Sequence, residues 1–446
     1  MSDARSIEPI GGPFAGSPRL PGSKSLTNRF YVLAALAHGT SRISHPLRSD
    51  DTDRLLRALE ILGVASRWEG DDVLIDGGGG RLPRGGRVDL GDGGTPTRFL
   101  LALATLAAGE VIIDGSPRMR ERPVDEGIAL LRSLGARIDA RRVADPQAPG
   151  REVERLPVTV TPNGPLSGGL IEVGKTASSQ FLSALLLIGP SCTTPLELRY
   201  QEAPTSASYL DLTIHAMTLV GAYATADRAA DGTLRGHRVR PGPQYPFDVT
   251  VESDASSAVY FAVAAALMPG ALVHLKGISS TSVQPDLRML DALKAMGARV
   301  GRFPSSIGIG GAPELVGIDC DASLFPDASL ALAVACAMAK GPSRIRGLET
   351  LTVKESDRIT ALATELTRIG CRCVATRDSI EIDPTSRHNE PVTIETYRDH
   401  RMAMSFAVLG LVRPGISIRD PECVGKSYPG FWSDLAQLRR YPSQTS

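Results

Sequence analysis

The sequence lacks an excess of charge of either sign. It contains 49 Lys and Arg residues and 49 Asp and Glu residues, so its formal net charge is zero. A neutral chain has no overall electrostatic field that would recruit nucleic acid or an acidic membrane surface. Any site for an anion must therefore be built from local clusters of Lys and Arg.

Cysteine is also scarce, and the six cysteines are scattered along the chain. A single residue separates Cys371 from Cys373, which is too close for the CxxC spacing, and the remaining spacings match no zinc pattern. We therefore expect reduced thiols in a cytosolic protein, with no metal site.

Long hydrophobic runs are absent from the sequence. The longest apolar run, 258–268, is too short to cross a bilayer. Residues 1–20 have neither the apolar core of a secretory signal nor the Arg/Ser-rich composition of a transit peptide. We expect a cytoplasmic protein whose 446 residues form two or more domains.

What the sequence does contain is a pattern that occurs six times. A polar segment is followed by an apolar, helix-like run, the run stops at a glycine, and a strand-like segment follows. The closing glycines are roughly 70 to 81 residues apart, longer than the periods of solenoid repeats; they are Gly39, Gly109, Gly189, Gly270, Gly341 and Gly415. The predicted helical runs are 30–37, 95–108, 178–188, 254–269, 327–340 and 399–414. Each unit is also expected to have a second helix that ends at glycine, so the sequence predicts a large α/β protein.

The first polar segment shows what these helix starts offer. Ser and Thr can bond the unpaired backbone N–H groups there, and Gly39 is expected to cap the C-terminal end of the helix. Lys24 and Arg29 fall in about the first turn, where a cation opposes the helix dipole unless an anion is nearby. The P-loop spacing fails, because Ser23 and Pro18 stand where that motif needs glycine. Lys24 is therefore predicted to contact an anionic substrate directly.

Five further segments carry groups suited to the same chemistry. Each also has an ordinary explanation: a glycine-rich turn at 91–98, a solvated arginine loop at 118–123, N-capping at 178–180, a capping box at 353–358 and a structural histidine in 399–404. Most of these segments lie at the start of a repeated first helix. If those helices point the same way, their positive ends would form a site for multiply charged anions.

In combination these segments resemble the enolpyruvyl transferase family. The matching stretches follow the family's order from about residue 21 to Lys426; they are 21–29, 94–98, 118–123, 178–182, 254–257, 326–327, 353–358 and 399–404. Each stretch is unspecific alone, whereas the ordered set is specific.

The resemblance implies a fold and a division into domains. The fold is a two-domain inside-out α/β barrel of six βαβαββ units, three in each domain. One domain is discontinuous, 1–21 plus 252–446, and the other is 22–251, with the active site expected in the cleft between them. Closure of such domains on substrate would exclude water.

The resemblance also implies a reaction. The enolpyruvyl group of phosphoenolpyruvate is transferred to the 5-hydroxyl of shikimate 3-phosphate, through a tetrahedral intermediate, and phosphate leaves. This is a step toward chorismate and the aromatic amino acids. It implies no metal or organic cofactor, two small-molecule substrates as partners, and neither nucleic acid nor membrane; we expect a monomer.

The family's site residues carry over position by position. Shikimate 3-phosphate is expected on Lys24, Ser25, Arg29, Ser178, Ser179, Gln180, Ser206, Asp327 and Lys354, with Tyr209 lining that site. Phosphoenolpyruvate is expected on Lys24, Gly94, Arg122, Gln180, Arg358, Arg401 and Lys426, with Arg98 supporting the loop. Asp327 is the expected base at the 5-hydroxyl, and Glu355, with Lys24 as partner, the expected proton-transfer group at the methylene carbon.

Two positions depart from the family pattern. Asp92 stands where the family usually has Asn, and its carboxylate would repel phosphoenolpyruvate unless a cation such as Arg98 neutralises it. Thr350 replaces a common Asn that contacts shikimate 3-phosphate, so one hydrogen bond is weakened or lost. Gly94 provides space for inhibitors of the glyphosate class. Because Asp92 departs from the family pattern beside it, the sequence does not determine whether the protein is sensitive to them.

Two other functions are compatible with parts of the pattern. The sister transferase that acts on UDP-N-acetylglucosamine usually has Cys in the loop matched by 118–123, and here no Cys precedes Cys192. A non-catalytic phosphometabolite-binding protein on the same scaffold would not need Lys24, Asp327, Glu355 and Arg401 together.

Overall fold

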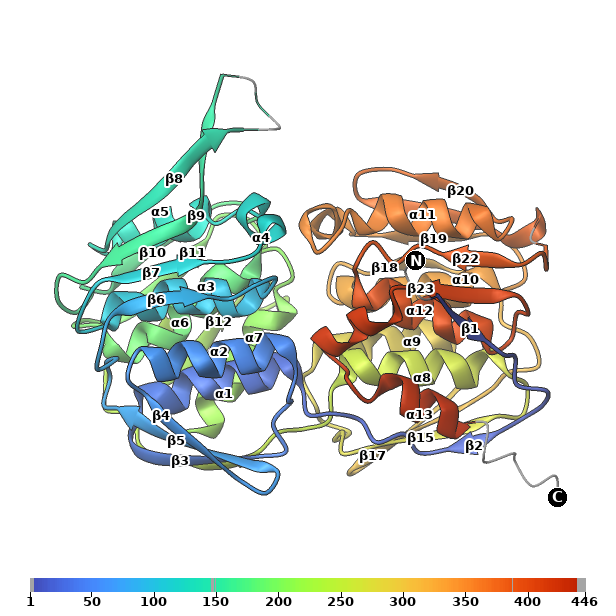
Figure 1. The fold of residues 1–446 in the computed structure, drawn as a ribbon, viewed down its shortest axis with the longest axis horizontal. Helices are drawn as coiled ribbons and strands as arrows, with labels where there is room; N and C mark the ends of the chain where they lie inside the picture. The colour runs from blue at the N-terminus through green and yellow to red at the C-terminus, as the bar shows by residue number, and fades with distance from the viewer. Residues whose placement is uncertain (1–3, 146–147, 149, 387, 439–446) are drawn as a thin grey trace. The chain divides into compact units, whose positions relative to one another are not determined.

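The computed structural model describes residues 4–145, 148, 150–386 and 388–438. The chain forms two compact units (Figure 1). Unit 1 comprises residues 1–23 and 252–446, and unit 2 comprises residues 24–251. The first boundary lies two residues beyond the expected one, because Gly22 pairs with Ser253 and the Ser23 N–H donates to the Glu252 carbonyl at 2.8 Å.

Unit 2 contains three four-stranded sheets of the same design. In each sheet a parallel pair of strands is extended by two antiparallel strands. The strand orders are β6 (Gly86–Asp89), β7 (Val111–Asp114), β9 (Glu152–Thr161), β8 (Arg137–Ala144); β14 (Asp248–Thr250), β3 (His38–Ser44), β5 (Asp72–Gly78), β4 (Ala65–Glu69); and β10 (Gly169–Val173), β11 (Leu196–Tyr200), β13 (Leu234–Val239), β12 (Ala224–Arg228).

Three buried helices form the centre of unit 2. They are α1 (Lys24–Leu36), α3 (Gly94–Leu103) and α6 (Ser179–Ile188), and each contacts the other two. Short 3₁₀ turns follow two of them, η1 (Ala104–Leu106) after α3 and η2 (Gly189–Ser191) after α6. The remaining helices are α2 (Asp50–Ile61), α4 (Pro117–Glu121), α5 (Asp125–Ser133) and α7 (Ser208–Leu219).

Unit 1 repeats this plan with one reduced sheet. Its strand orders are β16 (Arg299–Phe303), β17 (Ser306–Gly310), β15 (Leu272–Lys276), β2 (Ala15–Gly16); β18 (Asp319–Asp321), β19 (Ser343–Arg346), β21 (Ser379–Asp383), β20 (Arg372–Ala375); and the three-stranded β1 (Ala4–Ile7), β23 (Ile416–Arg419), β22 (Val392–Ile394). The central helices are α8 (Ala255–Leu267), α10 (Ser329–Ala337) and α12 (His400–Gly410), and the others are α9 (Met289–Ala295), α11 (Arg358–Arg368) and α13 (Phe431–Leu438). The 3₁₀ turns are η3 (Pro285–Arg288), η4 (Pro326–Ala328), η5 (Glu349–Val353), η6 (Pro384–Ser386) and η7 (Pro421–Lys426).

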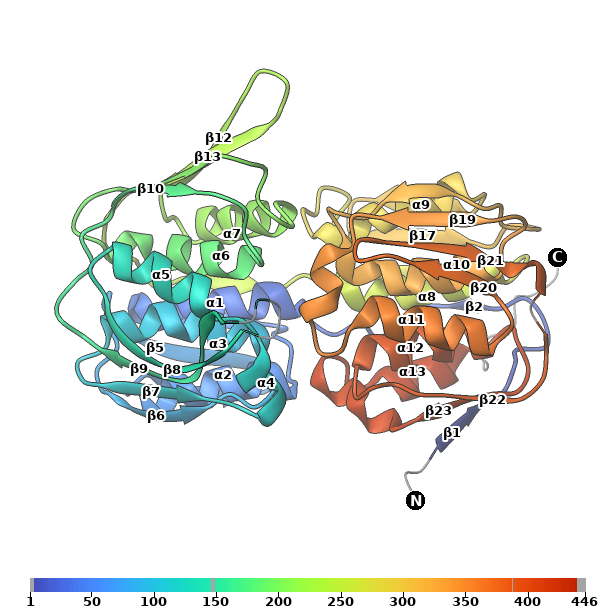
Figure 2. The same ribbon diagram turned by 90° about the horizontal axis from the view of Figure 1, so that it is seen from above.

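The composition of the central helices explains why they lie inside. All nine residues of α10, all eleven of α12 and eleven of the thirteen in α8 are buried. A helix that is apolar on every side has to be covered on every side, and the many alanines let three such helices pack closely. Each unit therefore has helices at its centre and sheets around them, the inside-out arrangement that the sequence predicts (Figures 1 and 2).

The prediction that each central helix ends at its closing glycine is correct for one helix of the six. α6 ends at Ile188 and Gly189 is its C-cap residue. In unit 1, α8, α10 and α12 end at Leu267, Ala337 and Gly410, before Gly270, Gly341 and Gly415, which have positive φ in the turns that follow. In unit 2, α3 ends at Leu103 and continues as η1, and α1 ends at Leu36 and passes almost directly into β3, so that Gly39 lies within that strand.

Two charged segments of unit 2, 139–155 and 223–243, belong to antiparallel hairpins, β8–β9 and β12–β13, that project from the unit (Figures 1 and 2). All six cysteines are free, and no helix within the described part of the chain is long and apolar enough to cross a bilayer.

Candidate active site

In unit 1 the N-terminal ends of the three central helices meet at one cluster of charged side chains. Asp327 lies in η4, directly before α10, and Arg401 is the second residue of α12. Arg401 Nη2 is 3.2 Å from Asp327 Oδ2, and Arg401 Nη1 is 3.9 Å from Asp286 Oδ2. The Ser256 hydroxyl, in the first turn of α8, donates to Asp286. Because these contacts join all three helix starts, the helix dipoles converge on the cluster.

Arg358 holds the cluster together. Its side chain is 1% exposed, and its guanidinium bonds three carboxylates: Nε to Asp399 at 2.7 Å, Nη1 to Asp327 at 2.9 Å and Nη2 to Glu355 at 2.8 Å. Burial lowers the pKa of Arg358, but the attraction of these carboxylates is larger, so the pKa lies above its ordinary value. A buried cation in this setting is locked in one orientation.

Asp327 is the carboxylate with the most cationic neighbours. Besides Arg358 and Arg401, Lys354 places Nζ 3.3 Å from its Oδ1. Burial raises the pKa of Asp327, but Arg401, Lys354 and Arg358 together outweigh burial and hold the pKa well below its usual range. Asp327 is therefore an ionised carboxylate at the meeting point of three cations.

Glu355 links a further cation to the cluster. Lys426, at the end of η7, places Nζ 2.8 Å from Glu355 Oε1. The charged side chains of the cluster are Lys354, Arg358, Arg401, Lys426, Asp286, Asp327, Glu355 and Asp399. Four cations thus face four carboxylates, and burial raises the pKa of Asp286 to about 7. The carboxylates keep the cations in place, and an anionic ligand would compete with them.

Unit 2 gathers a second set of polar groups at the starts of its central helices. Lys24 begins α1, and its Nζ lies 3.1 Å from Oδ2 of Asp51 in the first turn of α2. Asp51 is 3% exposed, so this ion pair fixes the ammonium beside the helix start. Ser49 is the N-cap residue of α2, and Asp50, Asp51 and Asp53 form its acidic first turn.

Arg122 is the buried member of the arginine segment 118–123. Arg118 pairs with Glu121 at 2.8 Å on the surface, and Arg120 pairs with Asp114 at 2.8 Å. Arg122 lies against Gly94, the first residue of α3: a Cβ at that glycine would come within 2.8 Å of both terminal nitrogens of the guanidinium. The absence of a side chain at Gly94 therefore gives Arg122 its position over the helix start.

Gln180 connects the starts of α3 and α6. Its carbonyl oxygen accepts a hydrogen bond from Arg98 Nη1 at 2.7 Å, and its Nε2 donates to Thr95 Oγ1 at 2.9 Å. Arg98 also donates to the carbonyl of Pro123, next to Arg122. These bonds fix the orientation of the amide and tie Arg122's loop to two helices, the supporting role expected of Arg98.

The other expected ligands of unit 2 lie in α1, at the start of α6 and at the start of α7. Ser178 is the N-cap of α6 and Ser179 its first residue. Arg29, in α1, donates from all three nitrogens to protein oxygens, among them Thr213 Oγ1 at 2.8 Å and the Tyr209 carbonyl at 3.0 Å. A substrate phosphate would have to share Arg29 with these acceptors. Ser206 precedes α7 with φ +52°, a left-handed conformation that is uncommon for serine.

The two departures from the family pattern have different surroundings. Asp92 accepts a hydrogen bond from the Ser116 hydroxyl, the N-cap of α4. Thr350 is 8% exposed, and its hydroxyl has no hydrogen-bond partner among the residues that the structure describes. The shorter threonine side chain thus leaves a buried polar atom unsatisfied where the family has an amide.

Three acidic residues of the site were missed as site residues by the sequence analysis. Asp399 was seen only as part of the segment 399–404, and Asp51, in the first turn of α2, carried only the ordinary preference of helix starts for acidic residues. Asp286 carried no signal, because nothing in its neighbourhood predicts contact with Arg401, 115 positions later. Among the described residues no group of three or more His, Cys, Asp or Glu side chains is placed to hold a metal ion.

Solved structures that are similar to this chain include an EPSP synthase and another enolpyruvyl transferase. The EPSP synthase of Acinetobacter baumannii superposes with a TM-score of 0.78 at 27% identity, covering 98% of both chains. The enolpyruvyl transferase NikO of Streptomyces tendae superposes with a TM-score of 0.73 at 19% identity over 98% of this chain and 97% of its own, a likeness of fold.

The sequence comparisons narrow this class to one family. The family model for EPSP synthase (3-phosphoshikimate 1-carboxyvinyltransferase) matches residues 9–435. The 3-phosphoshikimate 1-carboxyvinyltransferase of Methanoculleus marisnigri is 40% identical over 95% of this chain and 97% of its own. The pentafunctional AROM polypeptide of Yarrowia lipolytica is 38% identical over 97% of this chain, which corresponds to 28% of that polypeptide. The chain belongs to the EPSP synthase family.

Proposed function

We propose that the protein transfers the enolpyruvyl group of phosphoenolpyruvate to the 5-hydroxyl of 3-phosphoshikimate and releases phosphate, in the pathway to chorismate and the aromatic amino acids. The observation that carries this proposal is Asp327, an ionised carboxylate among three cations at converging helix starts, in a chain of this family. Both substrates are multiply charged anions, which fixed cations and helix N-termini accommodate. The enzyme acts as a cytoplasmic monomer on these two small molecules.

Each substrate is held by residues of both units. 3-Phosphoshikimate contacts Lys24, Ser25, Arg29, Ser178, Ser179, Gln180, Ser206, Tyr209, Asp327 and Lys354. Phosphoenolpyruvate contacts Lys24, Gly94, Arg122, Gln180, Arg358, Arg401 and Lys426.

Asp327 takes the proton of the 5-hydroxyl as that oxygen attacks phosphoenolpyruvate. In the free enzyme its lowered pKa makes it a weak base, since Arg401, Lys354 and Arg358 favour the ionised form. Bound phosphate and carboxylate groups offset the charge of Lys354 and Arg401. The pKa of Asp327 therefore rises when the substrates are in place, and the base becomes effective only then.

Glu355, with Lys24 as its partner, moves the proton at the methylene carbon. Protonation of that carbon and attack by the hydroxyl oxygen give a tetrahedral intermediate. Loss of a proton from the resulting methyl group and of phosphate from the central carbon then gives the enolpyruvyl ether. Lys426 and Arg358, which hold Glu355 at 2.8 Å each, set the orientation of its carboxyl group.

The proposal is tested by measuring phosphate release with each substrate alone and with both together. Release only when phosphoenolpyruvate and 3-phosphoshikimate are both present is the expected result. Binding of 3-phosphoshikimate without any release would favour the non-catalytic binding protein. Release with UDP-N-acetylglucosamine as acceptor would favour the sister transferase.

Replacing Arg122 with alanine should weaken the binding of phosphoenolpyruvate in particular. A charge-assisted hydrogen bond contributes about 1.5–3 kcal/mol, so the KM for phosphoenolpyruvate should rise about 10- to 150-fold. Steady-state kinetics with each substrate varied in turn measures this. Arg118→Ala, in the same segment but on the surface, is the matched control and should leave both KM values unchanged. A rise in the KM for 3-phosphoshikimate alone would show that the assignment of Arg122 to phosphoenolpyruvate is wrong.

A further inference from the structure

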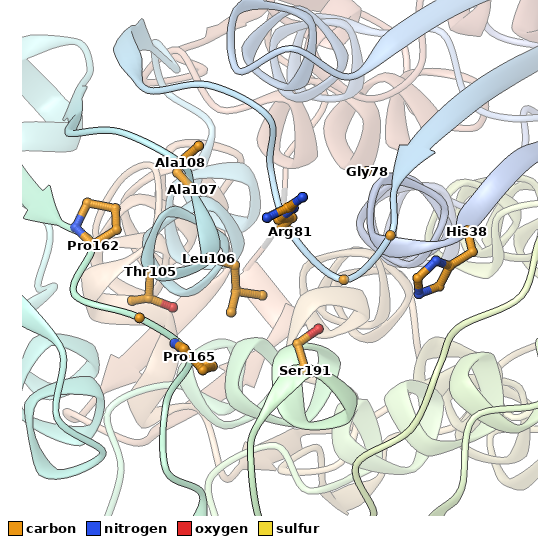
Figure 3. A pocket seen from close by; sticks show the side chains of 13 residues that line it. His38, Gly78, Arg81, Thr105, Leu106, Ala107, Ala108, Pro162, Pro165 and Ser191 are labelled. Carbon is orange, nitrogen blue, oxygen red and sulfur yellow. The ribbon is translucent and has the colours of Figure 1, made fainter.

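Unit 2 contains a cavity at the C-terminal ends of its three central helices (Figure 3). The cavity has a volume of about 590 Å³. The chain that follows each helix contributes to its wall: His38 after α1, the segment 105–108 after α3 and Ser191 after α6. The loops 78–81 and 162–165 supply the remaining lining residues.

This cavity is separate from the unit 2 residues assigned to the substrates. Lys24, Gly94 and Ser179 are the first residues of α1, α3 and α6, whereas the cavity lies where those helices have ended. A helix rises about 1.5 Å per residue, so the thirteen residues of α1 separate its two ends by about 20 Å. A ligand in the cavity could not touch the substrate residues.

The lining has the size and composition of a site for a small molecule. Such sites usually have volumes of about 300–1,000 Å³ and combine an apolar wall with a few polar groups. Here Leu106, Ala107, Ala108, Pro162 and Pro165 are apolar, and no Asp or Glu lines the cavity. The polar side chains are His38, Arg81, Thr105 and Ser191.

Two observations show polar groups that are available to a ligand. Ser191 Oγ is shielded from solvent and has no hydrogen-bond partner among the described residues, and Arg81 forms no ion pair within the same part of the chain. Thr105 differs, because its hydroxyl donates to the Ala102 carbonyl at 2.6 Å. Figure 3 shows Arg81 and Ser191 beside the same space, with Leu106 between them and Thr105.

The glycine loop passes beside His38 and Ser191. A Cβ at Gly79 would lie 2.9 Å from His38 Nδ1, and a Cβ at Gly80 would lie 3.6 Å from Ser191 Oγ. Both glycines have positive φ, and their N–H groups donate to the carbonyls of Ala37 and Leu36 at the end of α1. The loop is thus anchored to the helix, and a side chain at Gly79 would collide with the imidazole of His38.

The charges favour an anion even though helix C-terminal ends are partly negative. The dipole of a helix end acts weakly on a ligand near the protein surface, whereas arginine can donate two parallel charge-assisted hydrogen bonds to one carboxylate. The carbonyls of Leu36, Ala37 and Leu106 are moreover already occupied by backbone N–H groups. Arg81 therefore determines the preferred sign of the ligand.

We propose that this cavity binds a small organic anion, a carboxylate carried on a compact apolar body of about the size of one ring. Arg81, His38 and Ser191 hold the carboxylate. The apolar body packs against Leu106, Pro162 and Pro165.

Benzoate is a suitable probe, titrated into the full-length protein by isothermal calorimetry. The wild type should bind benzoate at least about tenfold more tightly than neutral benzamide. Arg81→Gln should lower the affinity for benzoate at least about tenfold. Arg84→Gln changes another exposed arginine, three residues further along and outside the lining; it is the matched control and should change the affinity less than about twofold. Ala108→Phe, which fills the cavity from an exposed position, should abolish binding; thermal unfolding checks that each variant is folded.

A second control separates the cavity from the cationic cluster of unit 1. Arg401→Gln should leave the affinity for benzoate unchanged. Any of four results would overturn the proposal. The wild type does not bind benzoate, or it binds benzoate and benzamide equally well. Alternatively, Arg401→Gln abolishes benzoate binding, or Arg81→Gln and Arg84→Gln weaken it equally. If Ala108→Phe does not fold, the comparison of Arg81→Gln with Arg84→Gln decides.

Discussion

Replacing Asp327 with alanine is expected to lower kcat by about 10²- to 10⁴-fold, the usual contribution of a positioned general base. The KM values should change much less, because Lys354, Arg358 and Arg401 remain to bind the anions. Single-turnover measurements with both substrates would separate the chemical step from binding. An unchanged kcat would show that Asp327 is not the base.

A matched control and the pH dependence sharpen this test. Asp319→Ala removes an exposed carboxylate in the same unit, paired with Arg346 at 2.9 Å, and should leave kcat unchanged. Because the pKa of Asp327 in the free enzyme lies below its ordinary value of 3.8, Asp327 is ionised at every pH above about 4. An inflection of kcat/KM near neutral pH would therefore belong to another group, such as Asp286, whose pKa is raised to about 7.

Replacing Arg358 with methionine is expected to destabilise the protein by about 3–5 kcal/mol, the usual cost of breaking a buried ion pair from one side. The change leaves Asp327, Glu355 and Asp399 close together without the cation between them. Urea unfolding followed by circular dichroism would measure the loss. Because a chain of two units need not unfold in one step, the transition of unit 1 has to be followed separately, for example through Trp432, which lies in that unit.

The control for Arg358 is Arg346→Met, which breaks the exposed pair with Asp319. Surface pairs contribute about 0–1 kcal/mol, so a loss as large as that of Arg358→Met would contradict the argument from burial. The pH dependence has a definite sign. The lowered pKa of Asp327 stabilises the fold above the ordinary value of 3.8, and that contribution is lost as the pH falls through the lowered pKa. The difference between wild type and Arg358→Met should therefore narrow in acid.

Local signals in the sequence were sufficient for the repeated elements. Asp399 before an apolar run predicted a helix start, and Asp399 is the N-cap residue of α12. Gly189 after an apolar run predicted a helix end, and it is the C-cap residue of α6. These signals are local because a cap acts within one turn of the chain. The same reasoning misjudged Gly39 and Gly415, because packing around the central helices ends α1 and α12 before those glycines.

The contacts inside the site could not be predicted in this way. Arg401 contacts Asp327 across 74 positions, and Gln180 contacts Arg98 across 82. Such pairs depend on which helix starts come together, and single residues do not encode that. The resemblance to a family supplied the set of candidate residues, whereas the partners Asp51, Asp286 and Asp399 became visible only in the structure.

The order in which strands join their sheets has a consequence for synthesis on the ribosome. β3 pairs with β14, whose residues 248–250 are made some two hundred positions after β3, and β1 pairs with β23 near the other end of the chain. The first sheet of unit 2 is therefore left with an open edge until almost all of that unit has been translated. β1 stays without its partner strand until nearly the whole chain has been made. During this interval the exposed edges can pair with other nascent chains, so the growing polypeptide should depend on chaperones more than its mature form does.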